Sequence, residues 1–445
     1  MPSLFKTVGW LRTPFVREFS WLSGANQISG LFSLLGLLVL AQVETVTVVG
    51  QVVFAQAVAG VVLLFLDLRF EDAIQRYFPQ MAMRSQATAE AFFWRLVRWD
   101  VAFGLCLALM TTIALATGII PETDSLVPPL VWVALLSSGL TTCVGSINAG
   151  FAVTGGLTLL GQLSLVAATA NALFMGAGAV LGGGLGYLLG GLVGSLLQLA
   201  LFLRFVRQRV KPSRHKIPPP PGMFKFLMSS SAASSVAVGS ESGVLTVAGL
   251  TGSPTLVALL RVSQAPARLL MAAFSPIAVQ AFPRLANMAV VRDQTGIAKL
   301  AERATRLTLI ASGTLCLVAL PLVHAVVETA FGPPYLAATL GVSLMLASGV
   351  LRSSIAWSKV LPLAVGRPGL RLVVVLVESA IMLAGAAILT YVVEDPGTAT
   401  SWLAGLHLTL ALLLFVFWLS IARSPRLIRA QGELDQDPPA ENGCP

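Results

Sequence analysis

The 445-residue chain is 56% hydrophobic and only 11% charged, and its mean hydropathy is +0.83. Soluble globular domains carry about a quarter charged residues, so this composition excludes a soluble globule and predicts a polytopic membrane protein. The net charge of +9 does not indicate nucleic-acid binding. The basic residues lie mostly in turns between apolar tracts, where membrane orientation and anionic headgroups account for them.

Residues 1–18 are predicted to form an amphipathic helix on the inner leaflet. Apolar side chains recur there at helical spacing beside basic ones, which is the pattern of an interfacial helix. The apolar members are Phe5, Val8, Leu11 and Phe15, and the basic ones are Lys6, Arg12 and Arg17. No cleavage-site pattern follows a short apolar core, so no removable signal peptide is predicted.

Twelve apolar tracts follow, each near the roughly 20 residues that a helix needs to cross a membrane. They cover residues 19–41, 49–68, 96–119, 128–150, 157–181, 183–205, 226–250, 255–282, 307–327, 337–361, 372–393 and 401–421. The sequence therefore predicts an all-α integral membrane fold of twelve helices. One six-helix half covers residues 19–206 and the other covers residues 225–422.

Residues 207–224 form a predicted linker that is basic and contains four consecutive prolines. Basic residues beside spans are retained on the cytoplasmic side, and prolines cannot continue a helix. Alternate turns between the spans contain no Lys or Arg, whereas the others are basic. Both termini are therefore predicted to be cytoplasmic. The polar, acidic tail 423–445 is predicted to be disordered.

A short repeat relates the two halves. AIQRYFPQM, from Ala73, corresponds to AVQAFPRLANM, from Ala278, at the end of the second span of each half. Because both halves begin on the same side, they are predicted to be repeats related by an axis along the membrane normal. Such pseudo-symmetric halves surround a central cavity, where a substrate path is expected.

Four glycines predict close helix packing in the sixth span. Gly182, Gly186, Gly190 and Gly194 fall four residues apart. Small residues at this spacing allow two helix backbones to approach in lipid.

Charged residues inside or beside the spans are the candidate functional residues, because such charges are costly and usually face a cavity. The predicted substrate-binding residues are Arg69, Arg76, Arg261, Arg268, Arg352 and Lys359, and the candidates for ion coupling or charge pairing are Glu241 and Glu378. Seven residues separate Arg261 from Arg268, and Arg352 from Lys359, so each pair is predicted to form a basic stripe on one helix. Guanidinium groups suit phosphate and pyrophosphate.

Structural roles compete with these assignments. Lys359 and Arg76 would also fit snorkelling to the inner interface, and Arg352 would also fit pairing with Glu378 or Glu241. The lone histidines His324 and His407 are expected to be structural.

The four cysteines offer neither a disulfide framework nor a metal-binding spacing. The chain also lacks P-loop and GxSxG motifs. No metal, no cofactor and no catalytic residue are predicted.

The chain resembles the bacterial polysaccharide (Wzx-type, O-antigen and exopolysaccharide) flippases of the multidrug/oligosaccharidyl-lipid/polysaccharide exporter superfamily. The resemblance covers nearly the whole chain: it includes LAQVETVTVVGQVVFAQAVAGVVLLFLDL and AIQRYFPQM in the first half, and LLRVSQAPARLLMAAFSPIAVQAFPRLANM in the second. The chain departs from the family's Asp-Leu-Gly after span two, where it has Asp67-Leu68-Arg69.

This resemblance implies a lipid-linked oligosaccharide flippase, not an enzyme. The implied substrate is an undecaprenyl-pyrophosphate-linked glycan, moved by alternating access from the inner to the outer leaflet of the bacterial cytoplasmic (inner) membrane. Implied partners are membrane lipids, a polysaccharide polymerase and assembly proteins. Two alternatives stay open: an organic-cation (multidrug) antiporter of the same superfamily, and a membrane glycosyltransferase or polymerase.

Overall fold

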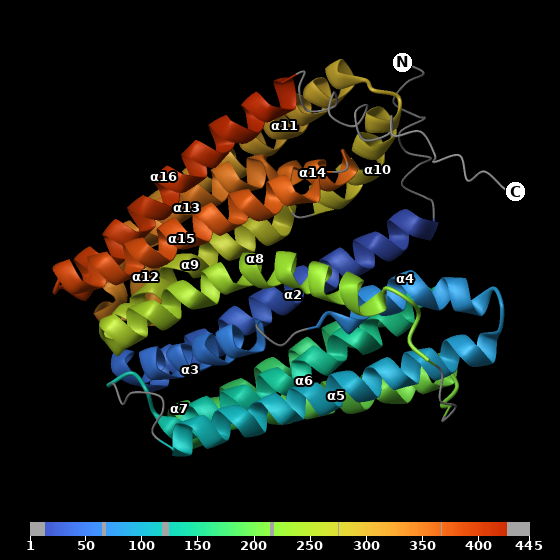
Figure 1. Ribbon diagram of the computed structural model, residues 1–445. Coiled ribbons are helices and arrows are strands. Elements are labelled where there is room, and N and C mark those ends of the chain that lie inside the picture. Colours follow the sequence, from blue (N-terminus) through green and yellow to red (C-terminus); the bar gives the residue numbers. More distant parts are fainter. Residues whose placement is uncertain are drawn as a thin grey trace, which may run out of the picture. The chain divides into compact units, whose positions relative to one another are not determined.

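The computed structural model describes residues 14–64, 68–117, 124–213, 218–274, 276–365 and 367–424. In these ranges the chain forms helices and no strands (Figure 1). Eight of the described helices are long and apolar enough to cross a membrane. The predicted all-α membrane fold is confirmed.

The described helices fit the predicted twelve spans. Three helices outside those eight lie over predicted spans: α2 (Pro14–Val43), α5 (Gln86–Ala116) and α8 (Met223–Thr251). One of the eight, α7 (Leu157–Arg209), covers two predicted spans in two legs.

The chain divides into two compact units. Unit 1 comprises Met1–Val262, Ala325–Ala338 and Ser379–Thr400, and unit 2 comprises Ser263–His324, Thr339–Glu378 and Ser401–Pro445. These units differ from the predicted halves, because α8 belongs to unit 1. The helices α9 (Pro254–Phe274), α12 (Val323–Phe331), α15 (Pro368–Val392) and α16 (Pro396–Arg423) each have residues in both units.

Unit 1 also contains α3 (Val46–Leu64), α4 (Phe70–Ala82), α6 (Pro128–Val153) and the short helix η2 (Pro333–Ala338). Its aromatic core includes the fully buried Phe92, Phe93, Phe151 and Phe202. These rings come from α5, α6 and α7 and fix the packing around α4.

The two legs of α7 turn at Gly182 and Gly183 (φ 58°, ψ −141°), a conformation that side-chain-bearing residues rarely adopt. A Cβ atom on Gly186 would overlap the carbonyl oxygen of Gly178, and one on Gly190 would overlap that of Phe174. The predicted close packing is confirmed at these positions, whereas Gly182 serves the turn and has nothing nearby.

Unit 2 contains the remaining helices. They are α10 (Pro276–Val290), α11 (Gln294–Ala319), η1 (Leu320–Leu322), α13 (Thr339–Ser354), η3 (Ala356–Lys359) and α14 (Leu361–Ala364). The side chain of Asp293 accepts a hydrogen bond from the Gly296 amide at 2.8 Å and so caps α11. Trp357 is buried and donates from Nε1 to Thr305 Oγ1 at 2.8 Å, which ties η3 to α11.

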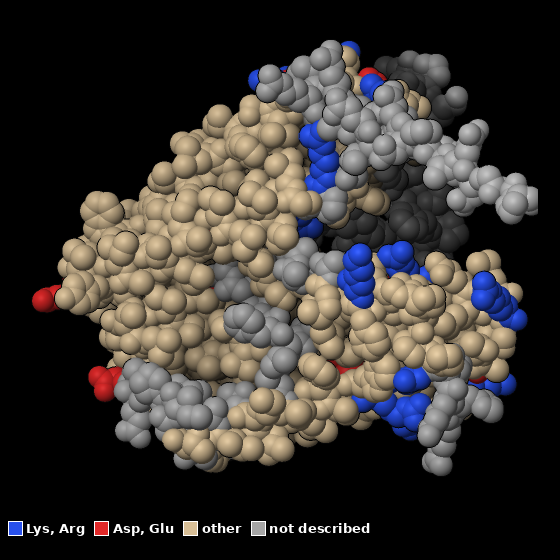
Figure 2. Space-filling model, viewed as in Figure 1, with Lys and Arg blue, Asp and Glu red and all other residues tan. Residues whose placement is uncertain are grey.

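Basic side chains collect toward one end of each unit. On the face seen in Figure 2, Lys and Arg of unit 1 lie largely toward the end that carries α4, and those of unit 2 lie near α10 and α11. The predicted topology requires this distribution within each unit. Which side is cytoplasmic stays a prediction.

Two predicted segments fall largely outside the described residues. Of the interfacial segment 1–18, only 14–18 is described, as the start of α2, and of the tail 423–445 only Arg423 and Ser424 are described. The linker is described at residues 207–213 and 218–224, and Arg207 and Arg209 still belong to α7.

Candidate functional site

Two clusters of charged and polar residues lie in or beside the spans, one within each unit. We call the first the Arg352 cluster; it consists of Arg352, Glu378, Ser348 and His407 in unit 2. The second, the Arg69 network, consists of Arg69, Glu71, Asp72, Asp100 and Ser146 in unit 1.

An ion pair between α13 and α15 is the centre of the Arg352 cluster. Arg352 Nη2 donates to Glu378 Oε1, and the two side chains are 21% and 14% exposed. A charge in a span is costly, and a close counter-ion offsets much of that cost. Of the two partners that the sequence left open, the structure pairs Arg352 with Glu378, so its charge is largely neutralised.

One turn before Arg352, α13 contributes Ser348. Its hydroxyl lies 2.7 Å from His407 Nδ1 on α16, and Arg352 is close enough to His407 for their charges to interact. The histidine thus contacts the helix that carries Arg352 and belongs to the cluster.

Arg268 lies on α9 in the same unit. Its Nη2 donates to Gln264 Oε1 at 3.2 Å, one helical turn away. Beside it, Ala267 packs so closely against Gly349 that a Cβ on the glycine would lie 3.3 Å from the Ala267 Cα and Cβ. This contact joins α9 to α13 one residue from Arg268 and three from Arg352.

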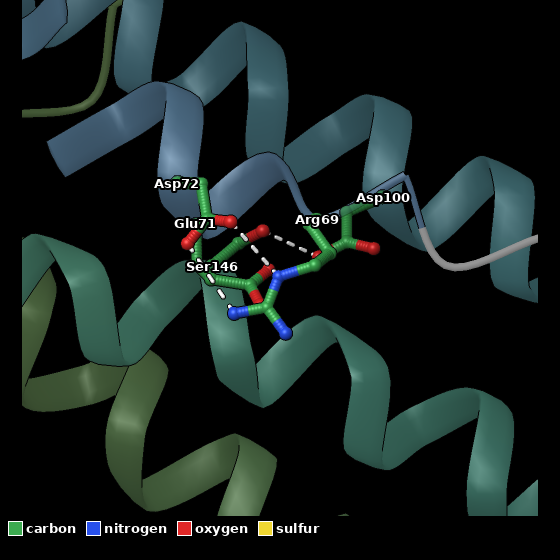
Figure 3. A network of polar contacts seen from close by, with 5 residues as sticks. All are labelled: Arg69, Glu71, Asp72, Asp100 and Ser146. Atoms are coloured by element: carbon green, nitrogen blue, oxygen red, sulfur yellow. Dashed lines mark hydrogen bonds and ion pairs between the residues drawn. The ribbon is translucent and has the colours of Figure 1, made fainter. Parts of the chain in front are cut away.

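The Arg69 network lies where the beginning of α4 packs against α5 and α6 (Figure 3). Arg69 lies 2.9 Å from Asp72 Oδ2 and 3.4 Å from Glu71 Oε1. Asp100, which is buried, accepts a hydrogen bond from Ser146. The network contains three carboxyl groups and one guanidinium, so its balance is acidic when all are ionised.

Arg69 adopts a left-handed backbone conformation (φ 44°, ψ 51°) at the N-cap of α4. This conformation costs a residue with a Cβ about 1–2 kcal/mol. The ion pairs with Glu71 and Asp72 help to hold the residue there.

The other four predicted residues lie on α4, α8, α9 and η3. Arg76 is exposed on α4, with its Cζ 4.4 Å from the Phe226 ring centroid. Arg261 is half-buried on the unit 1 part of α9, and Glu241 is exposed on α8. Lys359 is exposed in η3.

The predicted basic stripe of Arg352 and Lys359 is wrong. The α-helix α13 ends at Ser354, and Lys359 lies in a separate 3-10 turn. The seven-residue spacing assumed a continuous helix and does not hold across this break. By contrast, α9 is continuous through Arg261 and Arg268, so these two residues are two helical turns apart.

Asp100, Ser146 and Gln264 are site residues that were not predicted from the sequence. Asp100 is an acidic residue inside a predicted span, so the rule that selected Glu378 would have found it. Ser146 and Gln264 carry no signal until their partners are known. Among the described residues, no group of three His, Cys, Asp or Glu side chains could hold a metal ion.

Comparisons with known proteins show likeness at the level of fold. No protein-family model and no curated protein matches the sequence. The structure resembles the Vibrio cholerae MATE transporter VcmN in its bent form (TM-score 0.59, 13% identity), with 94% of this chain and 98% of that chain covered.

Two further solved structures are similar. A multidrug resistance MATE family transporter of the MOP superfamily in an outward-facing conformation has a TM-score of 0.61 at 12% identity, with 93% of this chain and 96% of that chain covered. A MOP superfamily transporter from Pyrococcus furiosus has a TM-score of 0.54 at 13% identity, with coverage of 92% and 96%. Over nearly its whole length, the chain has the fold of these MATE and MOP superfamily transporters.

Proposed function

We propose that this protein is a multi-pass transporter of the bacterial cytoplasmic membrane that works by alternating access. The likeness to MATE transporters over more than nine-tenths of the chain supports this proposal. Solved transporters of this fold include one in an outward-facing and one in an inward-facing conformation. The fold likeness offers no support for a membrane glycosyltransferase or polymerase.

The proposed cargo is a lipid-linked oligosaccharide with a pyrophosphate headgroup, moved from the inner to the outer leaflet. The observation that carries this assignment is the charge balance of four helices of the second half. The α9, α13, α15 and α16 segments contain the arginines 261, 268, 352, 371 and 423; Glu378 is their only carboxylate, and Arg423 pairs with Glu302 of α11. Glu378 pairs with Arg352, so these helices carry more positive than negative charge. A net positive charge suits an anionic headgroup.

Export of organic cations is the second candidate, and the comparisons back it better than they back the first. The similar structures include multidrug resistance MATE transporters, and the Arg69 network offers three carboxyl groups to one guanidinium. Yet the Pyrococcus furiosus structure is described as having a binding pocket of reverse polarity that suggests a different function. Proteins of this fold therefore differ in the polarity of their binding pockets.

Ligand-dependent stability distinguishes the two candidates. The full-length protein in detergent is heated with a prenyl-pyrophosphate-linked sugar or with ethidium, and the rise in melting temperature is measured, since a ligand that binds the native state stabilises it. The proposal predicts stabilisation by the pyrophosphate lipid that is lost in Arg268→Ala. If ethidium but not the pyrophosphate lipid raises the melting temperature, and if Asp100→Asn abolishes this rise, the protein exports organic cations instead.

A further inference from the structure

Two arginines of unit 1 lie on aromatic rings where α4, α5 and α8 meet. Arg76 Cζ is 4.4 Å from the Phe226 ring centroid and 5.5 Å from that of Tyr77. Arg95 Cζ is 4.4 Å from the Trp99 centroid. These distances are in the range of cation–π contacts.

The two contacts belong to one surface. Trp99 stacks on Phe224, with ring centroids 6.1 Å apart and planes at 26°, while Tyr77 meets Phe226 edge-on at 6.1 Å. Phe224 and Phe226 both lie in the first turn of α8. We call Arg76, Arg95, Tyr77, Trp99, Phe224 and Phe226 the stacked-arginine patch.

The patch is accessible at the beginning of α8, which covers a predicted span. Phe224 is 53% exposed, and the side chains of Arg76 and Lys225 are also exposed. The 29 residues of α8 extend about 43 Å at 1.5 Å per residue, longer than the hydrocarbon core of a bilayer. Its first turn therefore reaches the headgroup region, where aromatic and basic side chains are favoured.

The local charge is positive. No Asp or Glu occurs between Asp124 and Glu241, so α7, the linker and the first turn of α8 contribute only cations.

We infer that the stacked-arginine patch is a binding site for the phosphate of an anionic glycerophospholipid in the adjoining leaflet. The rings hold the guanidinium groups in place by cation–π contact, and the guanidinium N–H groups bind the phosphate oxygens. The exposed face of Phe224 and the neighbouring Met228, which is 62% exposed, contact the first part of the acyl chains. This site is separate from the Arg352 cluster and does not depend on the proposed cargo.

The test is lipid binding to the delipidated full-length protein by native mass spectrometry. Phosphatidylglycerol is compared with phosphatidylcholine, and free pyrophosphate is added as a competitor. Because a basic residue near an anionic lipid contributes about a fivefold change in affinity, Arg76→Ala and Arg95→Ala should each weaken phosphatidylglycerol binding about fivefold. Phosphatidylcholine binding should not change.

Two further variants separate a defined site from diffuse attraction. Arg204→Ala removes the same charge from an exposed position on α7, and it should change phosphatidylglycerol binding less than twofold. Trp99→Leu keeps every charge but removes the ring under Arg95, and it should weaken binding. If an alanine variant fails to fold, Arg76→Lys serves instead and should bind more weakly than wild type.

Equal losses in Arg204→Ala and Arg76→Ala, or unchanged binding in Trp99→Leu, would overturn the site and leave only net charge. Full displacement of phosphatidylglycerol by free pyrophosphate would assign the patch to a soluble anion, contrary to the inference.

Discussion

The ion pair between Arg352 and Glu378 provides the most quantitative test of the unit 2 cluster. Both side chains are less than a quarter exposed, so removing one partner leaves a largely buried charge without compensation. Truncating one partner of a buried pair costs about 3–5 kcal/mol. Since some exposure remains, we expect Arg352→Ala to lower the free energy of unfolding by about 3 kcal/mol, at the lower end of that range.

Removing both charges should restore most of this stability. Replacing a buried ion pair with uncharged groups of similar size is often neutral or better, so Arg352→Met combined with Glu378→Gln should lie within about 1 kcal/mol of wild type. The two single variants and the double variant form a thermodynamic cycle whose interaction energy measures the pair.

The same unit offers a matched control in the ion pair between Arg423 and Glu302. Its atoms are 2.8 Å apart, but its side chains are 63% and 39% exposed. Exposed pairs contribute about 0–1 kcal/mol, so Arg423→Ala should have little effect. Unfolding is followed by titration of SDS into mixed micelles. An Arg352→Ala effect no larger than that of Arg423→Ala would show that the pair with Glu378 does not stabilise the fold, and it would favour a substrate-binding role for Arg352.

Three further predictions concern unit 1 and the orientation of the chain. Arg69→Gly and Arg69→Ala both remove the ion pairs, but only Gly relieves the left-handed backbone, so the Gly variant should be more stable by about 1 kcal/mol in the same titration; equal stability would contradict the strain at this residue. Gly186→Val should separate the legs of α7 and lower the melting temperature, whereas Gly405→Val, where nothing lies within 4 Å, is the control; similar effects would refute close packing in α7. In a cysteine-free background, Thr398→Cys should react with an impermeant thiol reagent in whole cells and Ser213→Cys should not; the opposite pattern would invert the proposed topology.

The fold was predictable because its signals are long and redundant. A tract such as 128–150 is apolar throughout, and the structure extends it by only a few residues to Pro128–Val153. The spacing of Gly186 and Gly190 likewise predicted a close approach, since small residues are needed wherever backbones meet.

The candidate sites were only partly predictable, because they depend on which helices meet. The sequence selected Arg352 and Glu378 by their cost in a membrane but could not choose between Glu378 and Glu241 as the partner. The predicted basic stripe also required α13 to continue to Lys359. The helix instead ends at Ser354. Beyond this end, Trp357 is buried and donates a hydrogen bond to Thr305. Such tertiary contacts leave no periodic pattern in the sequence.

The central claim is that the cationic second half carries an anionic, lipid-linked cargo, and transport in proteoliposomes tests it most directly. A fluorescent prenyl-pyrophosphate-linked sugar is incorporated, and its movement between leaflets is followed by quenching from outside. We expect transport to be greatest in wild type, lower in Arg268→Lys and lowest in Arg268→Ala, because lysine keeps the charge but loses the planar fork. Arg303→Ala, at an exposed position on α11, should transport normally. Full transport by Arg268→Ala would contradict a role of this residue in binding the headgroup. Transport of ethidium and not of the pyrophosphate lipid would contradict the anionic, lipid-linked cargo.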